Sequence, residues 1–114
     1  MITLWHNPRC SKSRQALALL EEASAQVSVR RYLEESPTLD ELRAVHASMG
    51  APPVIAMMRT GEAEFKAAGL GKTDDDETLL HAMAAHPKLI ERPVAIRGDR
   101  AVLGRPPERV LELL

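Results

Sequence analysis

The sequence opens with MITLWHNPRCSKSR over residues 1–14, where an apolar segment gives way to a turn and then to a polar segment. Residues 1–5 are apolar or β-branched and are closed by His6-Asn7-Pro8, so we predict a buried strand followed by a turn. From Ser11 to about Ala25 apolar residues recur at helical spacing, which predicts a helix. Its inner face is expected to comprise Ala16, Leu17, Leu20 and Ala23.

The middle of the chain is predicted to be a second strand followed by helices. Residues 27–33 form the strand. Thr38 and Glu41, three positions apart, make a capping box that begins a helix running through Met49, where Gly50 ends it. The inner face of that helix is expected to comprise Leu39, Leu42, Val45 and Met49. Two short helices follow, over residues 52–58 and 62–68.

An acidic run at residues 74–77 allows two interpretations. Four consecutive carboxylates resemble a metal site or an interaction tail. They also suit the first turn of a helix, where negative charge is stabilised by the helix dipole. We favour the helix, which then runs to Ala85.

The end of the chain predicts a hairpin and a helix, and the order of elements predicts the fold class. Residues 93–97 and 100–103 are short apolar runs split by Gly98-Asp99, a two-residue hairpin signal, and Pro106-Pro107 suits the first turn of a final helix. Strand-helix-strand followed by strand-strand-helix is an α/β, thioredoxin-like arrangement, with β-α-β and β-β-α joined in one mixed sheet. We therefore predict a single domain over residues 1–114, with a helical insertion at about 37–88 between the two halves.

Composition narrows the class of protein. The chain has 114 residues, 45% of them hydrophobic and 3% aromatic, and a formal net charge of -1, which argues against a general nucleic-acid binder. No apolar run approaches the roughly 18 residues needed to cross a bilayer, and no signal peptide is recognisable. One cysteine cannot form an internal disulfide. We therefore expect a cytoplasmic protein without a membrane segment or a cysteine-rich zinc site.

The single cysteine, Cys10, is the strongest candidate for a reactive group. It lies at the start of a predicted helix, where free N–H groups and the helix dipole favour the thiolate, and Arg9, Lys12 and Arg14 add nearby positive charge. The alternative is an inert cysteine packed as a small hydrophobe. The polar neighbours favour a nucleophile.

Ser13 occupies the position where a second thiol would make a dithiol motif. Cys10 therefore cannot resolve a mixed disulfide within the chain and needs an external thiol. The Ser13 hydroxyl is placed to bond the thiolate or the local backbone, although a polar first-turn residue without a catalytic role fits equally well.

Four segments resemble the glutaredoxin-linked arsenate reductase family, which also includes Spx-type and YffB/YfgD-like relatives. Residues 6–14 match the family's His-Asn-Pro-x-Cys-x-x-Ser-Arg loop. The other matches are Met57-Met58-Arg59 followed by FKAAGL at 65–70, HPKLIERP at 86–93, and Gly104-Arg105-Pro106. The resemblance runs from the first residue to the last.

The resemblance implies a set of site residues around the catalytic Cys10. It implies that Arg59, Arg92 and Arg105 hold an oxyanion, although any one of them, taken alone, would be interpreted as a solvated surface charge. Pro93 matches the cis-proline that thioredoxin-like folds place opposite the cysteine. His6 matches a histidine that helps to lower the cysteine pKa, with a turn-capping histidine as the alternative. No metal ligands are expected, because His46, His81 and His86 lack ligand spacing.

The resemblance also implies an activity in arsenic detoxification. Cys10 thiolate would attack arginine-held arsenate, glutathione would add as co-substrate, and glutaredoxin would reduce the resulting mixed disulfide, with no bound cofactor. A general glutathione-dependent thiol reductase is the alternative enzyme, but a disulfide substrate needs no arginine cluster. An Spx-type regulator that binds RNA polymerase is the other alternative, which Ser13 weakens because such regulators commonly use a Cys-x-x-Cys pair.

Overall fold

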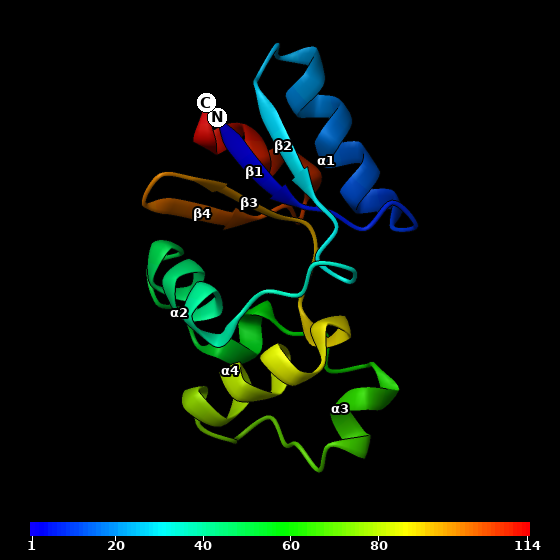
Figure 1. The fold of residues 1–114 in the computed structure, drawn as a ribbon, viewed down its shortest axis with the longest axis vertical. Helices are drawn as coiled ribbons and strands as arrows, with labels where there is room; N and C mark the ends of the chain where they lie inside the picture. Colours follow the sequence, from blue (N-terminus) through cyan, green and yellow to red (C-terminus); the bar gives the residue numbers. More distant parts are fainter. The chain divides into compact units, whose positions relative to one another are not determined.

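The computed structural model describes residues 1–114, which divide into two compact units. The sheet unit comprises residues 1–35 and 92–114, and the helical unit comprises residues 36–91. In Figure 1 the sheet unit takes the blue and red ends of the colour scale, and the helical unit takes the green and yellow middle. Each unit has its own buried apolar interior, so each is described separately below.

The sheet unit is built on four strands, β1 (Ile2–Trp5), β2 (Val27–Arg30), β3 (Val94–Arg97) and β4 (Arg100–Leu103). Their order in the sheet is β2-β1-β3-β4. The β1 and β2 strands pair in parallel, whereas β3 runs antiparallel to both β1 and β4. The predicted mixed sheet of an α/β, thioredoxin-like fold is therefore confirmed.

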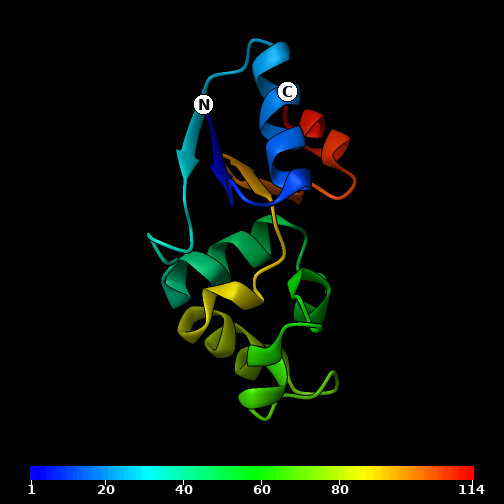
Figure 2. The ribbon, with the colours of Figure 1, turned by 90° about the vertical axis from the view of Figure 1, so that its right-hand side faces the viewer.

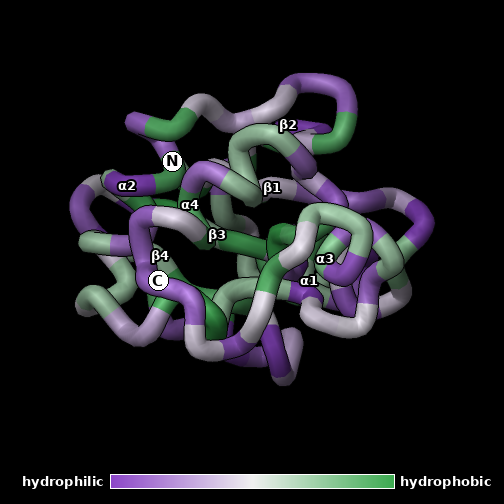
Figure 3. The backbone as a smooth tube through the Cα atoms, turned by 90° about the horizontal axis from the view of Figure 1, so that it is seen from below, coloured by the Kyte–Doolittle hydropathy of each residue, from purple (hydrophilic) through white to green (hydrophobic).

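The helix α1 (Ser11–Glu22) and the 3-10 helix η3 (Pro107–Leu113) lie on the same face of this sheet (Figure 2). They enclose one apolar cluster with the strands. Its buried members are Ile2, Leu4, Ala16, Leu20, Ala95, Val102, Val110 and Leu113. The strand β3 contributes Ala95 to this cluster, and its apolar part is drawn green in Figure 3. Burying each large aliphatic side chain contributes about 1.5–3 kcal/mol, so this cluster stabilises the frame that carries residues 6–13.

Two predicted boundaries in the sheet unit are wrong. The helix α1 ends at Glu22, and Ala23 is an exposed cap residue, while Ser13 joins the buried face instead. The strand β2 ends at Arg30 because the carbonyl of Arg31 accepts bonds from the N–H groups of residues 34 and 35 and closes a turn. This turn takes Tyr32 out of the strand and into the interior.

The final helix is a 3-10 helix, which the sequence analysis did not anticipate. Its buried residues are Pro107, Val110 and Leu113, spaced three apart. In a 3-10 helix, side chains at that spacing lie directly above one another on one face. The packing against α1 and the sheet therefore suits three residues per turn rather than 3.6.

The helical unit contains α2 (Leu39–Ser48), η1 (Val54–Met57), α3 (Ala63–Ala67), α4 (Asp76–Ala85) and η2 (Pro87–Leu89). The predicted sequence of helices is confirmed, with shorter bounds. The most deeply buried apolar side chains in this unit are Leu42, Val54, Met57, Leu79, Met83, Leu89 and Ile90. Of the four residues expected on the inner face of α2, Leu42 and Val45 are buried, whereas the two end positions are only half-buried.

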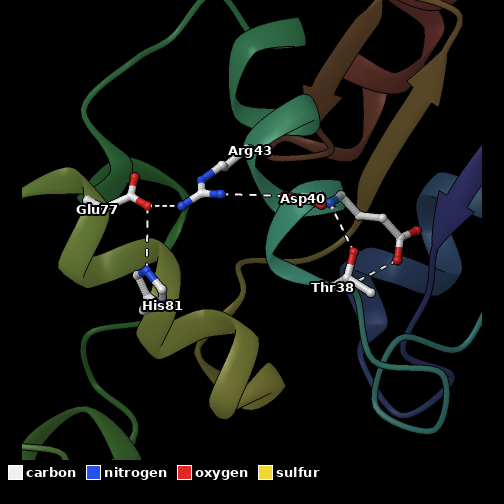
Figure 4. Close-up of polar contacts among 6 residues, drawn as sticks. Thr38, Asp40, Arg43, Glu77 and His81 are labelled. Atoms are coloured by element: carbon white, nitrogen blue, oxygen red, sulfur yellow. Dashed lines mark hydrogen bonds and ion pairs between the residues drawn. The ribbon is translucent and has the colours of Figure 1, made fainter.

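The capping box that begins α2 is present (Figure 4). The Glu41 backbone N–H donates to the Thr38 hydroxyl over 3.1 Å, and the Thr38 N–H donates to the Glu41 carboxylate over 3.0 Å. Farther along α2, Arg43 pairs with Asp40 and with Glu77 of α4. The contact with Glu77 joins the two long helices of the unit at their exposed edge, whereas the contact with Asp40 lies within α2.

The acidic run begins α4, as the sequence analysis favoured. Asp75 caps the helix, since its carboxylate accepts the Thr78 N–H over 2.7 Å. Hydrogen bonding by the Thr78 side chain, and then by its backbone, lowers the pKa of Asp75. Asp76 accepts the N–H of Val54 over 3.1 Å. The helix starts at Asp76 rather than at Asp74. No helix in the structure combines the length and apolarity that crossing a membrane requires.

Candidate active site

Cys10 is the cap residue at the start of α1, at the end of the loop that leaves β1. Its backbone is extended (φ -95°, ψ 123°), its N–H donates to the Asn7 carbonyl over 3.0 Å, and its own carbonyl accepts the Arg14 N–H over 3.0 Å. The side chain is 7% exposed. The loop therefore holds the sulfur at the end of the helix where backbone N–H groups remain unpaired within the helix.

Two arginines from distant parts of the chain reach the sulfur. The Arg105 Nη2 atom lies 3.7 Å from Cys10 Sγ, and the Arg105 Nε–H donates to the backbone carbonyl of Arg92 over 2.8 Å. The Arg92 side chain also interacts with the thiol by hydrogen bonding and by charge. The sheet unit thus brings together Cys10, Arg92 and Arg105, three of the predicted site residues.

The pKa of the Cys10 thiol is lower than that of a free cysteine. Burial by itself raises this pKa, but the hydrogen bond and charge of Arg92 and the backbone N–H groups of Ser13 and Lys12 outweigh burial. The thiolate is the nucleophilic form of cysteine, so the surroundings favour reactivity. Lys12 acts here through its backbone N–H, and the cation that lowers the pKa comes from Arg92 rather than from a neighbour in the sequence.

Ser13 and His6 form a buried polar pair behind the loop. The His6 Nδ1 atom lies 2.6 Å from the Ser13 Oγ atom, which also accepts the N–H of Asn7 over 3.1 Å. Burial, followed by the charges of Arg31 and Arg14, lowers the pKa of His6, so its ring is neutral at pH 7. This pair fixes the backbone between β1 and α1. A role of His6 and the Ser13 hydroxyl in setting the cysteine pKa stays a prediction.

Tyr32 is a residue of this site that the sequence analysis missed. The residue is 1% exposed, and its hydroxyl lies near the side chains of Arg92 and Asn7. Burial and, to a smaller extent, the charge of Cys10 raise the pKa of this hydroxyl. The only available signal was that Tyr32 is the sole tyrosine in the chain and falls near the end of a predicted strand, over residues 27–33. An aromatic residue in that place is usually interpreted as part of the core.

Gly104, the residue that follows β4, packs against the segment that carries part of the site. The peptide bond between Arg92 and Pro93 is cis, and the Pro93 carbonyl accepts the Gly104 N–H over 2.8 Å. A Cβ atom on Gly104 would lie 2.6 Å from Cγ of Pro93 and 3.1 Å from Cγ1 of Val110. Only glycine therefore fits here without displacing the segment that carries Arg92 and the chain that leads to Arg105.

Arg59, the third predicted arginine, belongs to the helical unit. Its guanidinium lies 2.6 Å from the Glu62 carboxylate and 4.0 Å from that of Glu91, and its backbone N–H donates to the Leu89 carbonyl. An antiparallel β-bridge between Met58 and Ile90 joins this segment to the last residues of the helical unit. Participation of Arg59 in an oxyanion site stays a prediction.

A hollow of about 230 Å³ lies beside the cysteine loop in the sheet unit. We call it the loop hollow. It is lined by residues 6–9 on one side and by Arg31, Leu33 and Glu34 on the other. Its lining includes two exposed cations, Arg9 and Arg31, and the apolar residue Leu33, which is 42% exposed. The loop hollow can therefore accept a small molecule that carries carboxylates.

The chemistry open to this arrangement is that of an activated thiol beside two guanidinium groups. Guanidinium groups stay charged at all physiological pH values and bind tetrahedral oxyanions through paired N–H donors. His, Cys, Asp and Glu side chains form no group of three that could hold a metal ion.

A mixed four-stranded sheet with such a thiol at the start of its first helix defines a thioredoxin-like protein with a single cysteine. The chain belongs to the ArsC family, that of the arsenate reductases, whose model matches residues 5–113.

One relative and two solved structures illustrate this membership. The chain is 42% identical over 114 residues to an arsenate reductase of Haemophilus influenzae, with 99% of this chain and 98% of the relative covered. The solved structure of an arsenate reductase from Vibrio cholerae superposes with a TM-score of 0.93 at 46% identity, covering 99% of this chain and 97% of the other. A putative arsenate reductase from Yersinia pestis gives a TM-score of 0.89 at 43% identity, with 98% and 99% covered.

Proposed function

We propose that this protein reduces arsenate to arsenite, with Cys10 as the nucleophile and with glutathione and glutaredoxin as the source of electrons. The observation that carries the proposal is the meeting of Arg92 and Arg105 at the sulfur of Cys10. The similarity to arsenate reductases over nearly the whole chain supports the same substrate.

Arsenate suits this site because of its charge and shape. It is a tetrahedral oxyanion that carries between one and two negative charges at neutral pH, so a thiolate would repel it in water. Arginine side chains offset this repulsion and stabilise the charge that develops as sulfur attacks arsenic. A disulfide substrate carries no such charge and gains nothing from a pair of guanidinium groups.

The proposed reaction begins at the Cys10 thiolate. Its sulfur attacks arsenic(V), a S–As bond forms, and an arsenate oxygen leaves as water after taking up protons. A glutathione thiolate then attacks the Cys10 sulfur. As the new S–S bond forms, the electron pair of the S–As bond passes to arsenic, which leaves as arsenite, arsenic(III). Cys10 is then joined to glutathione as a mixed disulfide.

Regeneration of the thiolate needs a further thiol, because Cys10 is the only cysteine in the chain. A glutaredoxin thiolate would attack the glutathione sulfur, and the electron pair of that S–S bond would return to Cys10 as the thiolate. The depressed pKa of Cys10 favours this step, since a thiolate of low pKa is a good leaving group. This scheme places the protein in the cytoplasm, where these thiols are kept reduced.

The loop hollow is where we place glutathione before it reacts. Glutathione carries two carboxylates and one ammonium group at neutral pH. The loop hollow offers the guanidinium groups of Arg9 and Arg31 for the carboxylates. It also offers, for the ammonium, the carboxylate of Glu34, which lies 4.0 Å from the Arg31 guanidinium. It adjoins the loop that ends at Cys10.

The decisive experiment compares two substrates with one enzyme preparation. Purified protein receives glutathione and glutaredoxin, together with either arsenate or a glutathionylated peptide disulfide. Arsenite is measured directly, and oxidation of glutathione is followed as NADPH consumption by added glutathione reductase. We expect reduction of arsenate, abolished by Cys10→Ser. Turnover of the disulfide alone would instead identify a general thiol reductase, and arsenite formation by Cys10→Ser would remove the mechanism.

A further inference from the structure

The Tyr32 hydroxyl is a buried polar group that no protein atom satisfies. The residue is 1% exposed, and its oxygen makes no hydrogen bond of good geometry with the protein. Leaving a buried donor unsatisfied costs about 1–3 kcal/mol, and more than nine in ten buried polar groups do have a partner. A ligand that accepts a hydrogen bond from this hydroxyl would therefore recover that cost in stability.

The surroundings of this hydroxyl are those of the reactive thiol. The side chains of Arg92 and Asn7 lie near it, and the charge of Cys10 acts on it. Cys10 is itself 7% exposed and is reached by the same Arg92. An oxyanion that contacts the sulfur and Arg92 would therefore come close to the Tyr32 hydroxyl.

The phenol keeps its proton under the conditions in which the thiol reacts. Burial raises the pKa of Tyr32, and this effect outweighs the opposing charge of Arg92. Tyr32 is therefore an O–H donor when Cys10 is already a thiolate. A neutral donor suits an anion site because it binds an anionic oxygen without adding charge that would compete with the arginines for the thiolate.

We propose that Tyr32 is a substrate-binding residue whose hydroxyl donates a hydrogen bond to the oxyanion held at Cys10. This inference rests on the proposed function, because the oxyanion is the substrate assigned above. It adds to the arginines a neutral donor from the turn that follows β2.

A positioning role is the competing explanation, in which the hydroxyl anchors Arg92 and acts on the thiol only through it. The two roles differ in what Tyr32→Phe changes. Loss of a ligand weakens oxyanion binding and leaves the Cys10 pKa where it was. Loss of an anchor frees the Arg92 side chain and raises the Cys10 pKa, since Arg92 is the cation that lowers it.

The first measurement uses the fact that Tyr32 is the only tyrosine in the chain. Protein labelled with ¹³C at the tyrosine Cζ position gives a single phenol resonance, observed in Cys10→Ser protein so that arsenate binds without reacting. We expect this resonance to move in a saturable way as arsenate is added, and sodium chloride at equal ionic strength serves as the control. A resonance that stays fixed while calorimetry records binding would overturn the inference.

The second measurement compares Tyr32→Phe with the parent protein. We expect arsenate affinity to fall about 10-fold or more, the usual effect of losing a hydrogen bond to a charged group. The pH midpoint for alkylation of Cys10 by iodoacetamide should be unchanged in protein that is otherwise wild type. Unchanged affinity, or a raised midpoint, would overturn the ligand role. Failure of both parent and variant to bind or reduce arsenate would instead overturn the proposed function.

Discussion

The Nη2 atom of Arg105 lies 3.7 Å from the Sγ atom of Cys10, although 95 positions separate the two residues in the chain. The contact depends on the sheet, because β4 ends immediately before Gly104 and Arg105, beside the start of β3, which follows Arg92. The Arg105 Nε–H is held by the Arg92 carbonyl, so the guanidinium is fixed at one side and its Nη2 group faces the thiol. A group placed in this way can bind an oxyanion as the thiol attacks it.

We expect Arg105→Ala to reduce kcat/KM for arsenate by about 10- to 100-fold, the effect of losing one or two charge-assisted hydrogen bonds. Arg105 is an exposed residue, so the fold should tolerate the change. Arg100→Ala removes an equal charge from an exposed position at the start of β4 and serves as the matched control. Equal rates for the two variants would exclude Arg105 from the site.

Arg92→Ala should raise the Cys10 pKa. In the folded protein Arg92 lowers this pKa against the opposing effect of burial, so its removal leaves burial dominant. Alkylation rates measured from pH 5 to pH 10 should show a midpoint at higher pH in the variant. At pH 7 the variant should therefore react more slowly with iodoacetamide and reduce less arsenate, whereas the rates should converge above the higher midpoint.

The same shift makes a statement about stability. A thiol whose folded pKa is depressed stabilises the folded protein above that pKa and loses this stabilisation as the pH falls through it. The difference in the free energy of unfolding between wild type and Cys10→Ser should therefore become more favourable to wild type as the pH rises through the depressed pKa toward 9.0, the ordinary pKa of the thiol. Urea titrations at several pH values test this trend. A difference that is independent of pH would show that Cys10 titrates normally.

The sequence predicted the local elements of this fold well, because their signals are local. The capping box at Thr38 and Glu41 and the acidic start of α4 were found where residue type and spacing indicated them. The 3-10 form of η3 was missed because it depends on Pro107, Val110 and Leu113 packing against α1 and the sheet. Periodicity in a short segment cannot distinguish three residues per turn from 3.6.

The site could be predicted only in part. Cys10 follows from its place before a helix, whereas Arg92 and Arg105 entered through the family resemblance, since an isolated arginine in a sequence indicates a surface charge. Tyr32 was missed because its function depends on which neighbours the turn after β2 brings to its hydroxyl. Long-range contacts of this kind exist only after the sheet has formed.

The loop hollow gives a prediction about glutathione rather than arsenate. Removing one of its cations, in Arg9→Ala or Arg31→Ala, should raise the KM for glutathione by about 2- to 5-fold, a typical loss for one exposed charge pair. The KM for arsenate should stay the same. Arg109→Ala is the control, because Arg109 is an exposed residue of η3 that pairs with Glu112. A parallel change in both KM values would place these arginines at the oxyanion instead.

Gly104→Ala should lower both stability and activity, because the added methyl group would lie 2.6 Å from Cγ of Pro93. Neither the proline ring nor Val110 on the other side can move without disturbing the core, and overpacking of this kind costs about 1–3 kcal/mol. Gly61→Ala is the matched control, since a Cβ atom there meets nothing within 4 Å. Urea unfolding should show a lower midpoint for Gly104→Ala alone.

The displaced segment carries Arg92, so kcat for arsenate should fall in the same variant even at temperatures where it is fully folded. Normal stability and activity in Gly104→Ala would show that the backbone there relaxes and that the close approach of Pro93 is not needed to hold the arginines at Cys10.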